Sequence, residues 1–271
     1  MCLCVWLCAS VGAFADVRVR VQPTPGGPQI HVDGTPVPPK AHIPATHVLE
    51  RYGLVWLCPG EPKADIPKFI EDEDPTYRRI NNPVEVWQCS TGRLVDNFCD
   101  ITHFPFVHTG TFGTDQSTEV PPVSLGDLDD CFYGYSYAVE VANTELGAGA
   151  SGQSAGTVQR RMTTGFSLPF TVRSTIHYHT GLDHILLLLS TPIDDVTSLF
   201  TFVVWRNDDF SVPADSIIAF DRAIGEEDHR MLERIPGVLP LDQTSLVSVQ
   251  ADRCSVEWRR RLRELLAGNR F

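Results

Sequence analysis

The chain has 271 residues, 42% of them hydrophobic, and a formal net charge of -12. It is long enough to bury a large core in one or two domains, and its acidic balance argues against a nucleic-acid partner. Its 20 glycines and 20 prolines favour a β-rich or α+β protein over a helical bundle.

The apolar segment over residues 1–15 is too short to cross a bilayer, and we expect no membrane partner. It ends in Ala13-Phe14-Ala15, which resembles a signal-peptidase site but lacks a basic leading region. This pattern is compatible with two alternatives, a cleaved leader and a truncated or misassigned start. The eight cysteines are not spaced as a disulfide framework. We therefore expect buried free thiols and a cytoplasmic location.

Residues 17–60 are predicted to be β-structure. Residues 17–21 alternate between apolar and polar side chains, and residues 47–58 have the pattern of a hairpin that ends in a strongly apolar strand. Proline and glycine then follow at residues 59–62. We expect a domain boundary there, with one domain over residues 1–62 and a second over residues 63–271.

A helix is predicted over about residues 92–104, and it carries the most informative motif of the chain. Asp100 and His103 are three residues apart, so they would share one helix face. Pro105 would end or kink this helix, which lets His108 turn toward His103. With one distant carboxylate the two histidines would make a 2-His-1-carboxylate triad, a set that suits non-haem Fe(II). The alternative is two ordinary surface histidines, since the chain has nine histidines.

The rest of the chain is predicted as a sheet followed by helices. A Gly/Ala/Ser segment over residues 146–156 has the composition of a lid or a linker, and it lacks the lysine of a phosphate-binding loop. Strands are expected over residues 131–141, 158–164, 167–180, 183–190 and 198–206, and helices over residues 216–235 and 255–267.

Three segments in this order resemble the oxygenase (alpha) component of Rieske non-haem iron aromatic ring-hydroxylating oxygenases, in the vanillate-demethylase-like subgroup. They are Glu50-Arg51-Tyr52-Gly53-Leu54-Val55-Trp56, Asn97-x-x-Asp100-x-x-His103-x4-His108 and Glu227-Asp228-x-x-Met231-Leu232-Glu233. With the C-terminal segment Ser255-Val256-Glu257-Trp258-Arg259-Arg260-x-Leu262, the resemblance spans roughly residues 35–265. The resemblance implies an α+β fold, with a C-terminal helix-grip (START/Bet v1-like) catalytic domain preceded by an all-β remnant of a Rieske domain.

The same resemblance implies a role for each site residue. His103, His108 and Asp228 would be the ligands of a mononuclear Fe(II). Glu226 and Glu227 compete with Asp228 for the carboxylate position, but Asp228 occupies the position that matches the family motif.

Two further residues receive roles from the resemblance. Asp100 would be the bridging acid that connects a Rieske histidine of one subunit to the iron site of the next. Asn97 would lie near the iron without being a firm ligand. Both would act in catalysis rather than as metal ligands.

The function implied is that of an oxidoreductase, a monooxygenase or dioxygenase. It would use O2 to hydroxylate or demethylate a small apolar substrate, either aromatic or terpenoid- or sterol-like. A ferredoxin or flavin reductase would supply electrons, and the assembly would be a homotrimer.

One family feature is missing from the sequence. Rieske 2Fe-2S clusters are held by two cysteines and two histidines, yet no Cys-x-His or Cys-x-x-His pair occurs here. Residues 1–30 are interpreted as a misassigned start or foreign sequence. The truncated chain is expected to show little or no turnover, and the alternative function is a non-catalytic helix-grip module that binds an apolar ligand.

Overall fold

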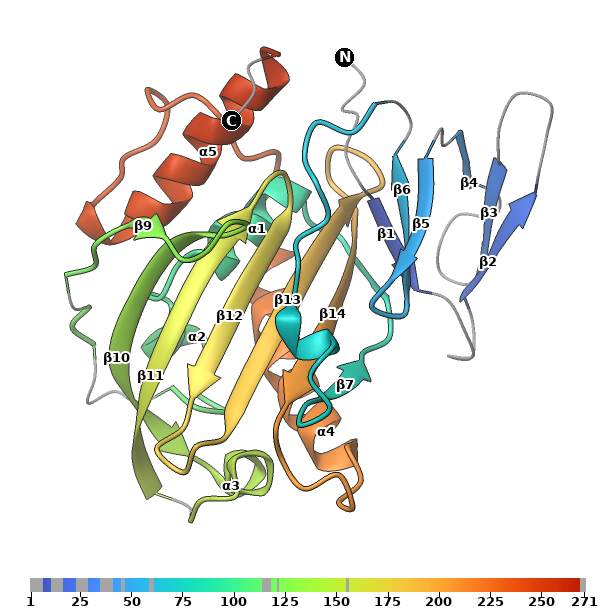
Figure 1. Ribbon diagram of the computed structural model, residues 1–271. Helices are drawn as coiled ribbons and strands as arrows, with labels where there is room; N and C mark the ends of the chain where they lie inside the picture. The colour runs from blue at the N-terminus through green and yellow to red at the C-terminus, as the bar shows by residue number, and fades with distance from the viewer. Residues whose placement is uncertain are drawn as a thin grey trace.

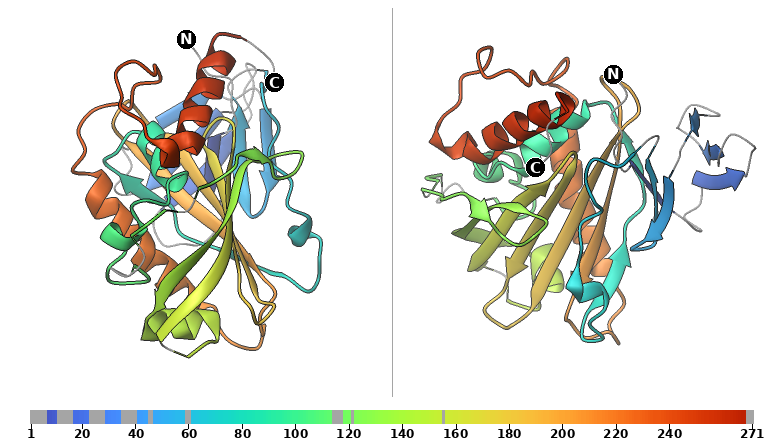
Figure 2. Two further views of the ribbon diagram at one scale, coloured as in Figure 1. Left: turned by 90° about the vertical axis from the view of Figure 1, so that its left-hand side faces the viewer. Right: turned by 45° about the horizontal axis from the view of Figure 1, so that its top comes forward.

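The computed structural model describes residues 7–10, 17–22, 29–34, 41–44, 47–58, 61–113, 118–120, 122–154 and 156–268. A curved antiparallel sheet forms its middle layer (Figure 1). The long helix α4 lies against one face of this sheet and the strands β5 and β6 lie on the other side, as the left view of Figure 2 shows. The expected α+β organisation is therefore present.

The large sheet has the strand order β7-β14-β13-β12-β11-β10-β9, and β8 also pairs with β14. Along β11 the side chains of Arg160, Met162 and Thr164 are buried, whereas Arg161 between them is exposed. This alternation aims every second residue of the strand at the helices. The strands are β7 (Arg78–Asn81), β8 (Glu85–Trp87), β9 (Gly126–Asp127), β10 (Tyr133–Asn143), β11 (Gly156–Ser167), β12 (Thr171–His177), β13 (Asp183–Pro192) and β14 (Ser198–Arg206).

The helices cover the inner face of the sheet and bury most of the core. One apolar cluster joins Leu94 of α1 and Ile217 of α4 to Phe200 and Val204 of β14. A second joins Trp258 of α5 to Val95 of α1 and to the strands β10 to β12. The α-helices are α1 (Thr91–Phe98), α2 (Phe104–Val107), α3 (Glu145–Ser151), α4 (Asp215–Leu232) and α5 (Arg253–Leu266), and the 3₁₀-helices are η1 (Ile70–Asp72) and η2 (Gln250–Asp252).

The β-structure predicted for residues 17–60 is confirmed where the structure describes it. One small sheet has the order β1-β6-β5 and a second has the order β2-β3-β4. Tyr52 and Gly53 both have positive φ, 60° and 68°, as a tight two-residue hairpin turn requires. The strands are β1 (Leu7–Ser10), β2 (Val17–Gln22), β3 (Gln29–Gly34), β4 (Ala41–Pro44), β5 (His47–Arg51) and β6 (Leu54–Cys58).

The hairpin β5–β6 packs on the outer face of the large sheet through aromatic rings. Trp205 of β14 stacks on Phe69 at 4.4 Å between centroids and meets Tyr52 edge-on at 5.1 Å. Leu54 and Trp56 of β6 belong to the same buried cluster. The residues on the two sides of position 62 therefore share one apolar core.

The prediction of a single helix over residues 92–104 is wrong. Helix α1 ends at Phe98, and a turn follows in which Asp100 accepts hydrogen bonds from the backbone N–H groups of Thr102 and His103, both at 3.0 Å. A side chain that captures these donors competes with continued helix. Pro105 does not break a helix but lies in the first turn of α2, where its missing N–H costs nothing.

The expected lid or linker over residues 146–156 is also wrong, because Glu145–Ser151 forms the helix α3. The Thr144 hydroxyl caps its start by accepting a hydrogen bond from the Gly147 N–H at 3.2 Å. Gly152 ends it in the left-handed region at φ 65°. These two end signals outweigh a glycine-rich composition.

Two smaller expectations can be compared with the described residues. Cys89, Cys99 and Cys254 are buried free thiols, as predicted, Cys58 is buried as well, and Cys131 is a partly exposed thiol. Across the described part of the chain, no helix combines the length and the apolar character needed to cross a membrane.

Candidate metal centre

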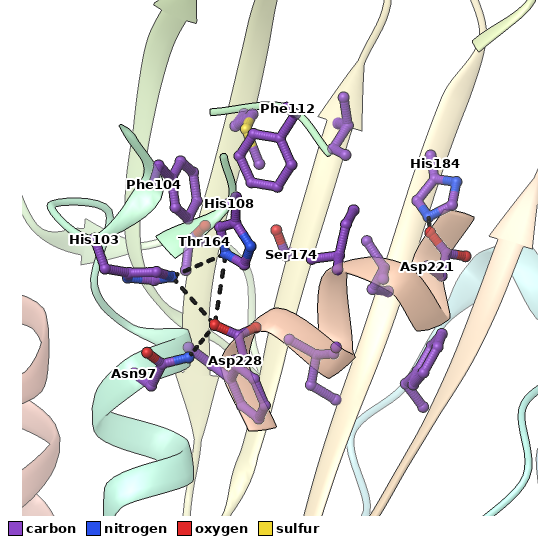
Figure 3. Close-up of a pocket in the computed structure, with 18 of the residues that line it drawn as sticks. Asn97, His103, Phe104, His108, Phe112, Thr164, Ser174, His184, Asp221 and Asp228 are labelled. Atoms are coloured by element: carbon purple, nitrogen blue, oxygen red, sulfur yellow. Dashed lines mark hydrogen bonds and ion pairs between the residues drawn. The ribbon is translucent and has the colours of Figure 1, made fainter. Parts of the chain in front are cut away.

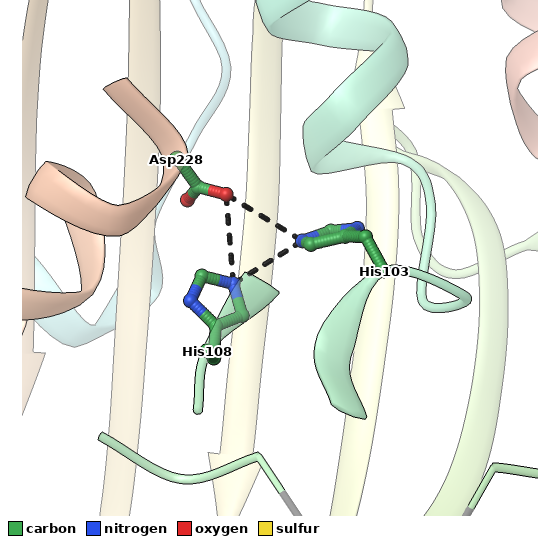
Figure 4. A group of neighbouring side chains, drawn as sticks. All are labelled: His103, His108 and Asp228. Carbon is green, nitrogen blue, oxygen red and sulfur yellow. Dashed lines mark hydrogen bonds and ion pairs between the residues drawn. The ribbon is translucent and has the colours of Figure 1, made fainter. Parts of the chain in front are cut away.

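The structure brings His103, His108 and Asp228 together, with one ligand atom of each within 4.8 Å of the others. His103 directly precedes α2, His108 directly follows it, and Asp228 lies near the end of α4. The two Nε2 atoms are 3.2 Å apart, and Asp228 Oδ1 lies 3.6 Å from that of His103 and 3.5 Å from that of His108. Figure 4 shows the three side chains converging on one point.

The Asp100 carboxylate fixes the orientation of His103. Its Oδ2 lies 2.8 Å from His103 Nδ1, and since a carboxylate can only accept, the ring carries its hydrogen on Nδ1. Burial would raise the pKa of Asp100, but hydrogen bonds from His103 and Thr102 outweigh it and hold this pKa below its ordinary value. His103 therefore presents the lone pair of Nε2 to the centre.

Glu227 fixes His108 in the same way. Its Oε2 lies 3.1 Å from His108 Nδ1 and accepts a hydrogen bond from the Thr111 hydroxyl at 2.6 Å, while Oε1 accepts from the Gly110 N–H at 2.7 Å. Burial would raise the pKa of Glu227, and these hydrogen bonds lower it below its ordinary value. A Cβ at position 110 would meet Glu227 Oε1 at 2.7 Å, so only glycine leaves room for this contact.

Asn97 holds the third member of the group. Its Nδ2 on α1 donates to Asp228 Oδ1 at 3.0 Å, so the amide orients the carboxylate oxygen that faces the histidines (Figure 3). Asp228 is nearly fully buried. Each of the three possible metal ligands is thus held by a hydrogen bond from a different part of the chain.

The donor set fits a divalent transition metal. Both Nε2 atoms carry lone pairs, and with Asp228 Oδ1 they form three electron-rich atoms that face one another. Without a cation this contact is repulsive. Metal–ligand bonds of about 2.1 Å would place neighbouring ligand atoms roughly 3.0–3.4 Å apart, close to the observed spacings. A histidine that binds a metal through one ring nitrogen usually donates the N–H of the other nitrogen to a carboxylate or carbonyl. Both histidines do this here through Nδ1.

The triad opens into a cavity of about 110 Å³ between the sheet and the helices. Aromatic and aliphatic side chains make up most of its wall, and a small polar group lies at the end near His184 and Asp221 (Figure 3). The apolar lining includes Phe98, Phe104, Phe112, Met162, Ile176, Leu186, Leu188, Phe200, Phe202, Phe220 and Ile224. Such a wall is suited to an apolar molecule.

The five residues singled out from the sequence all lie at this centre. The contact of Glu227 with His108 was not predicted from the sequence, where Glu227 was only a competitor of Asp228 for the carboxylate position. The sequence did contain a signal for this contact. Consecutive residues of a helix point about 100° apart, so two adjacent acids can contact the same site in different directions.

Comparison with known proteins places the chain in a family. Residues 87–268 match the vanillate O-demethylase oxygenase C-terminal domain. The chain belongs to this family, the catalytic domain of Rieske oxygenase alpha subunits, whose enzymes are demethylases and monooxygenases.

Individual relatives agree with the family. The chain is 28% identical over 237 residues to methylxanthine N1-demethylase NdmA of Pseudomonas putida, a match that covers 85% of this chain and 63% of that protein. The structure of NdmA with caffeine from P. putida CBB5 superposes with a TM-score of 0.67 at 25% identity, over 90% of this chain and 72% of that chain.

The fold also extends to a more distant structure. Dicamba monooxygenase bound to 3,6-dichlorosalicylic acid superposes with a TM-score of 0.68 at 18% identity, over 99% of both chains. The α+β fold class predicted from the sequence is confirmed by these structures.

Proposed function

We propose that the chain is the catalytic part of an oxygenase that binds one Fe(II) through His103, His108 and Asp228. Its reaction would be the O2-dependent hydroxylation or demethylation of a small apolar, aromatic substrate. The observation that carries the proposal is the convergence of three lone-pair atoms, each fixed by a separate hydrogen bond, at the wall of an apolar cavity.

Iron held in this way would supply the activation of O2, with electrons delivered from outside the site. The protein contributes position and shelter. Asp100, Glu227 and Asn97 hold the ligand atoms in place before any metal arrives. The cavity wall excludes water and keeps the substrate beside the triad, which limits unproductive side reactions.

Asp100 is the residue through which we propose that electrons arrive. It bonds His103 on one side and also lines a second pocket, which it shares with Arg93, Ser248 and Arg259. By analogy with the family, a cluster-bearing domain of a neighbouring subunit in a homotrimer would dock there, and the 271-residue chain itself carries no ligands for that cluster. A ferredoxin or flavin reductase in the cytoplasm would reduce that cluster. Residues 1–62 would be a partial Rieske-like domain and residues 63–271 the catalytic domain.

Iron binding is the direct test of the centre. The chain, purified without metal and titrated anaerobically with Fe(II), is expected to bind one iron per chain with micromolar or better affinity. Elemental analysis after gel filtration gives the stoichiometry. A chain that retains no iron above a buffer blank would contradict the proposal.

Turnover is expected to be low for the 271-residue chain by itself. It contains neither cysteine–histidine pair of a Rieske cluster, so neither this chain nor a second copy of it would hold the cluster that reduces the iron. Product formation from N-methyl or O-methyl aromatic substrates, with a reductase and NADH, is expected to stay below one equivalent per iron. Clear multiple turnover under these conditions would refute this expectation.

A second function, the binding of an apolar ligand without chemistry, is favoured by the same absence of cluster ligands. The apolar cavity alone is sufficient for it. Iron content separates the two functions: a stoichiometric iron supports the oxygenase, and ligand binding by an iron-free chain with no affinity for iron supports the binding module.

A further inference from the structure

Arg160 is a buried cation in the wall of the cavity. It projects from β11 on the same side as Met162 and Thr164, and all three line the cavity. Its relative exposure is 2%. Its Nε and Nη2 atoms are buried, and neither has a hydrogen-bond partner among the residues that the structure describes. Buried guanidinium donors left unpaired are costly, so their presence beside a cavity indicates a missing partner.

Two aromatic rings fix the position of this guanidinium. The Arg160 Cζ atom lies 5.6 Å from the centroid of Phe112 and 5.5 Å from that of Tyr178. Phe112 stacks in turn on His108, with 4.6 Å between the ring centroids. Phe112 therefore contacts both Arg160 and His108, and the guanidinium and the triad line the same cavity.

The neighbouring charges are already balanced by one another. Asp208 binds both Arg78 and Arg206. Arg206 also donates to His184 Nδ1 at 2.5 Å, so His184 Nε2 carries the hydrogen and faces Asp221 Oδ1 at 3.2 Å. Arg78 and Arg206 thus share Asp208, and Asp221 is held by His184 rather than by an arginine.

Arg160 takes part in none of these ion pairs. In the described part of the chain no carboxylate lies within ion-pair distance of it, and Asp221 acts on it only from farther away. Burial lowers the pKa of Arg160. An anion that enters the cavity would meet an unpaired fork of N–H donors, the geometry that binds a carboxylate through two parallel hydrogen bonds.

We propose that Arg160 determines substrate specificity by binding a carboxylate of an aromatic substrate, with the opposite end of the ring directed to the triad. This assignment rests on the proposed function for the identity of the reacting end. The carboxylate contact itself concerns binding alone and is measurable without iron or turnover.

The test compares two ligands of equal shape, 4-methoxybenzoate and 4-methoxybenzamide, by calorimetry on the full chain. Hydrogen bonds to a charged group contribute about 1.5–3 kcal/mol, so the wild type is expected to bind the carboxylate about 10–100-fold more tightly than the carboxamide. This comparison needs no variant. Equal affinities, or no binding of the carboxylate, would overturn the proposal.

Variants of Arg160 then test whether this residue causes the preference for the carboxylate over the carboxamide. Arg160→Gln is expected to bring the two affinities to within about threefold, and Arg160→Lys to keep part of the preference because it retains the charge without the fork. Arg161→Gln is the matched control: it is the next residue on β11 but exposed on the other face, and it should leave the preference unchanged. A preference that survives in Arg160→Gln would refute the assignment.

A variant of the triad separates this proposal from the proposed function. His103→Ala removes an iron ligand but leaves Arg160 in place, so the preference for the carboxylate is expected to persist in it. If the wild type binds no iron yet prefers the carboxylate through Arg160, the oxygenase proposal fails and this one stands.

Discussion

His103→Ala is expected to abolish stoichiometric iron binding. The variant removes one of three converging ligand atoms and leaves Asp100 without its ring partner. Loss of one ligand from a three-residue site should weaken Fe(II) binding by more than about 100-fold, since even removal of an outer partner of a ligand costs 10–100-fold. Anaerobic titration with a competing chelator measures the affinity.

Two other variants make this result specific. His229→Ala changes a histidine directly beside Asp228 on α4, but His229 stacks on Trp87 and bonds Glu233, so iron binding should be unaffected. Glu227→Gln keeps the shape of the partner of His108 and removes its charge, and it should give an intermediate loss. Iron binding by His103→Ala at wild-type affinity would show that the ligand assignment is wrong.

Trp258→Ala is expected to lower the free energy of unfolding by about 3–5 kcal/mol, as other large-to-small changes in protein cores do. The side chain is fully buried, and its Nε1 donates to the Pro169 carbonyl at 2.7 Å. Its ring also faces Gly92 at the start of α1. The substitution would therefore loosen the attachment of α5 to both α1 and the sheet.

Urea denaturation followed by circular dichroism measures this loss. Trp258→Phe keeps most of the apolar volume but leaves the Pro169 carbonyl unpaired, and it should cost about 1–3 kcal/mol. Val247→Ala, at a position that is 98% exposed, should change stability by less than about 0.5 kcal/mol. A Trp258→Ala chain as stable as Val247→Ala would show that α5 contributes little to the fold.

The sequence predicted the regular elements well where one pattern dominates. The β14 segment was expected over residues 198–206 and is found there, because a long apolar run bounded by turns has few other solutions. The prediction failed where a side-chain hydrogen bond or a helix cap determines where an element begins or ends. The turn at Asp100 and the helix capped by Thr144 each depend on one hydrogen bond that periodicity does not encode.

For the candidate centre, too, the sequence predicted the residues but not all of their contacts. Spacing and the family resemblance named Asn97, Asp100, His103, His108 and Asp228, and the structure gathers all five. The contact between Glu227 and His108 joins residues 119 positions apart, so it depends on how α4 is placed against α2. The unpaired state of Arg160 was equally hidden, because a sequence shows a charge but not which partners folding leaves it.

The bonds of Glu227 have a consequence for how the centre is assembled. Glu227 joins α4 to the segment around α2 through His108, Thr111 and Gly110, and none of these bonds involves a metal. These hydrogen bonds therefore hold together the two segments that carry the triad. An ion bound at the triad would then need little further ordering of these segments.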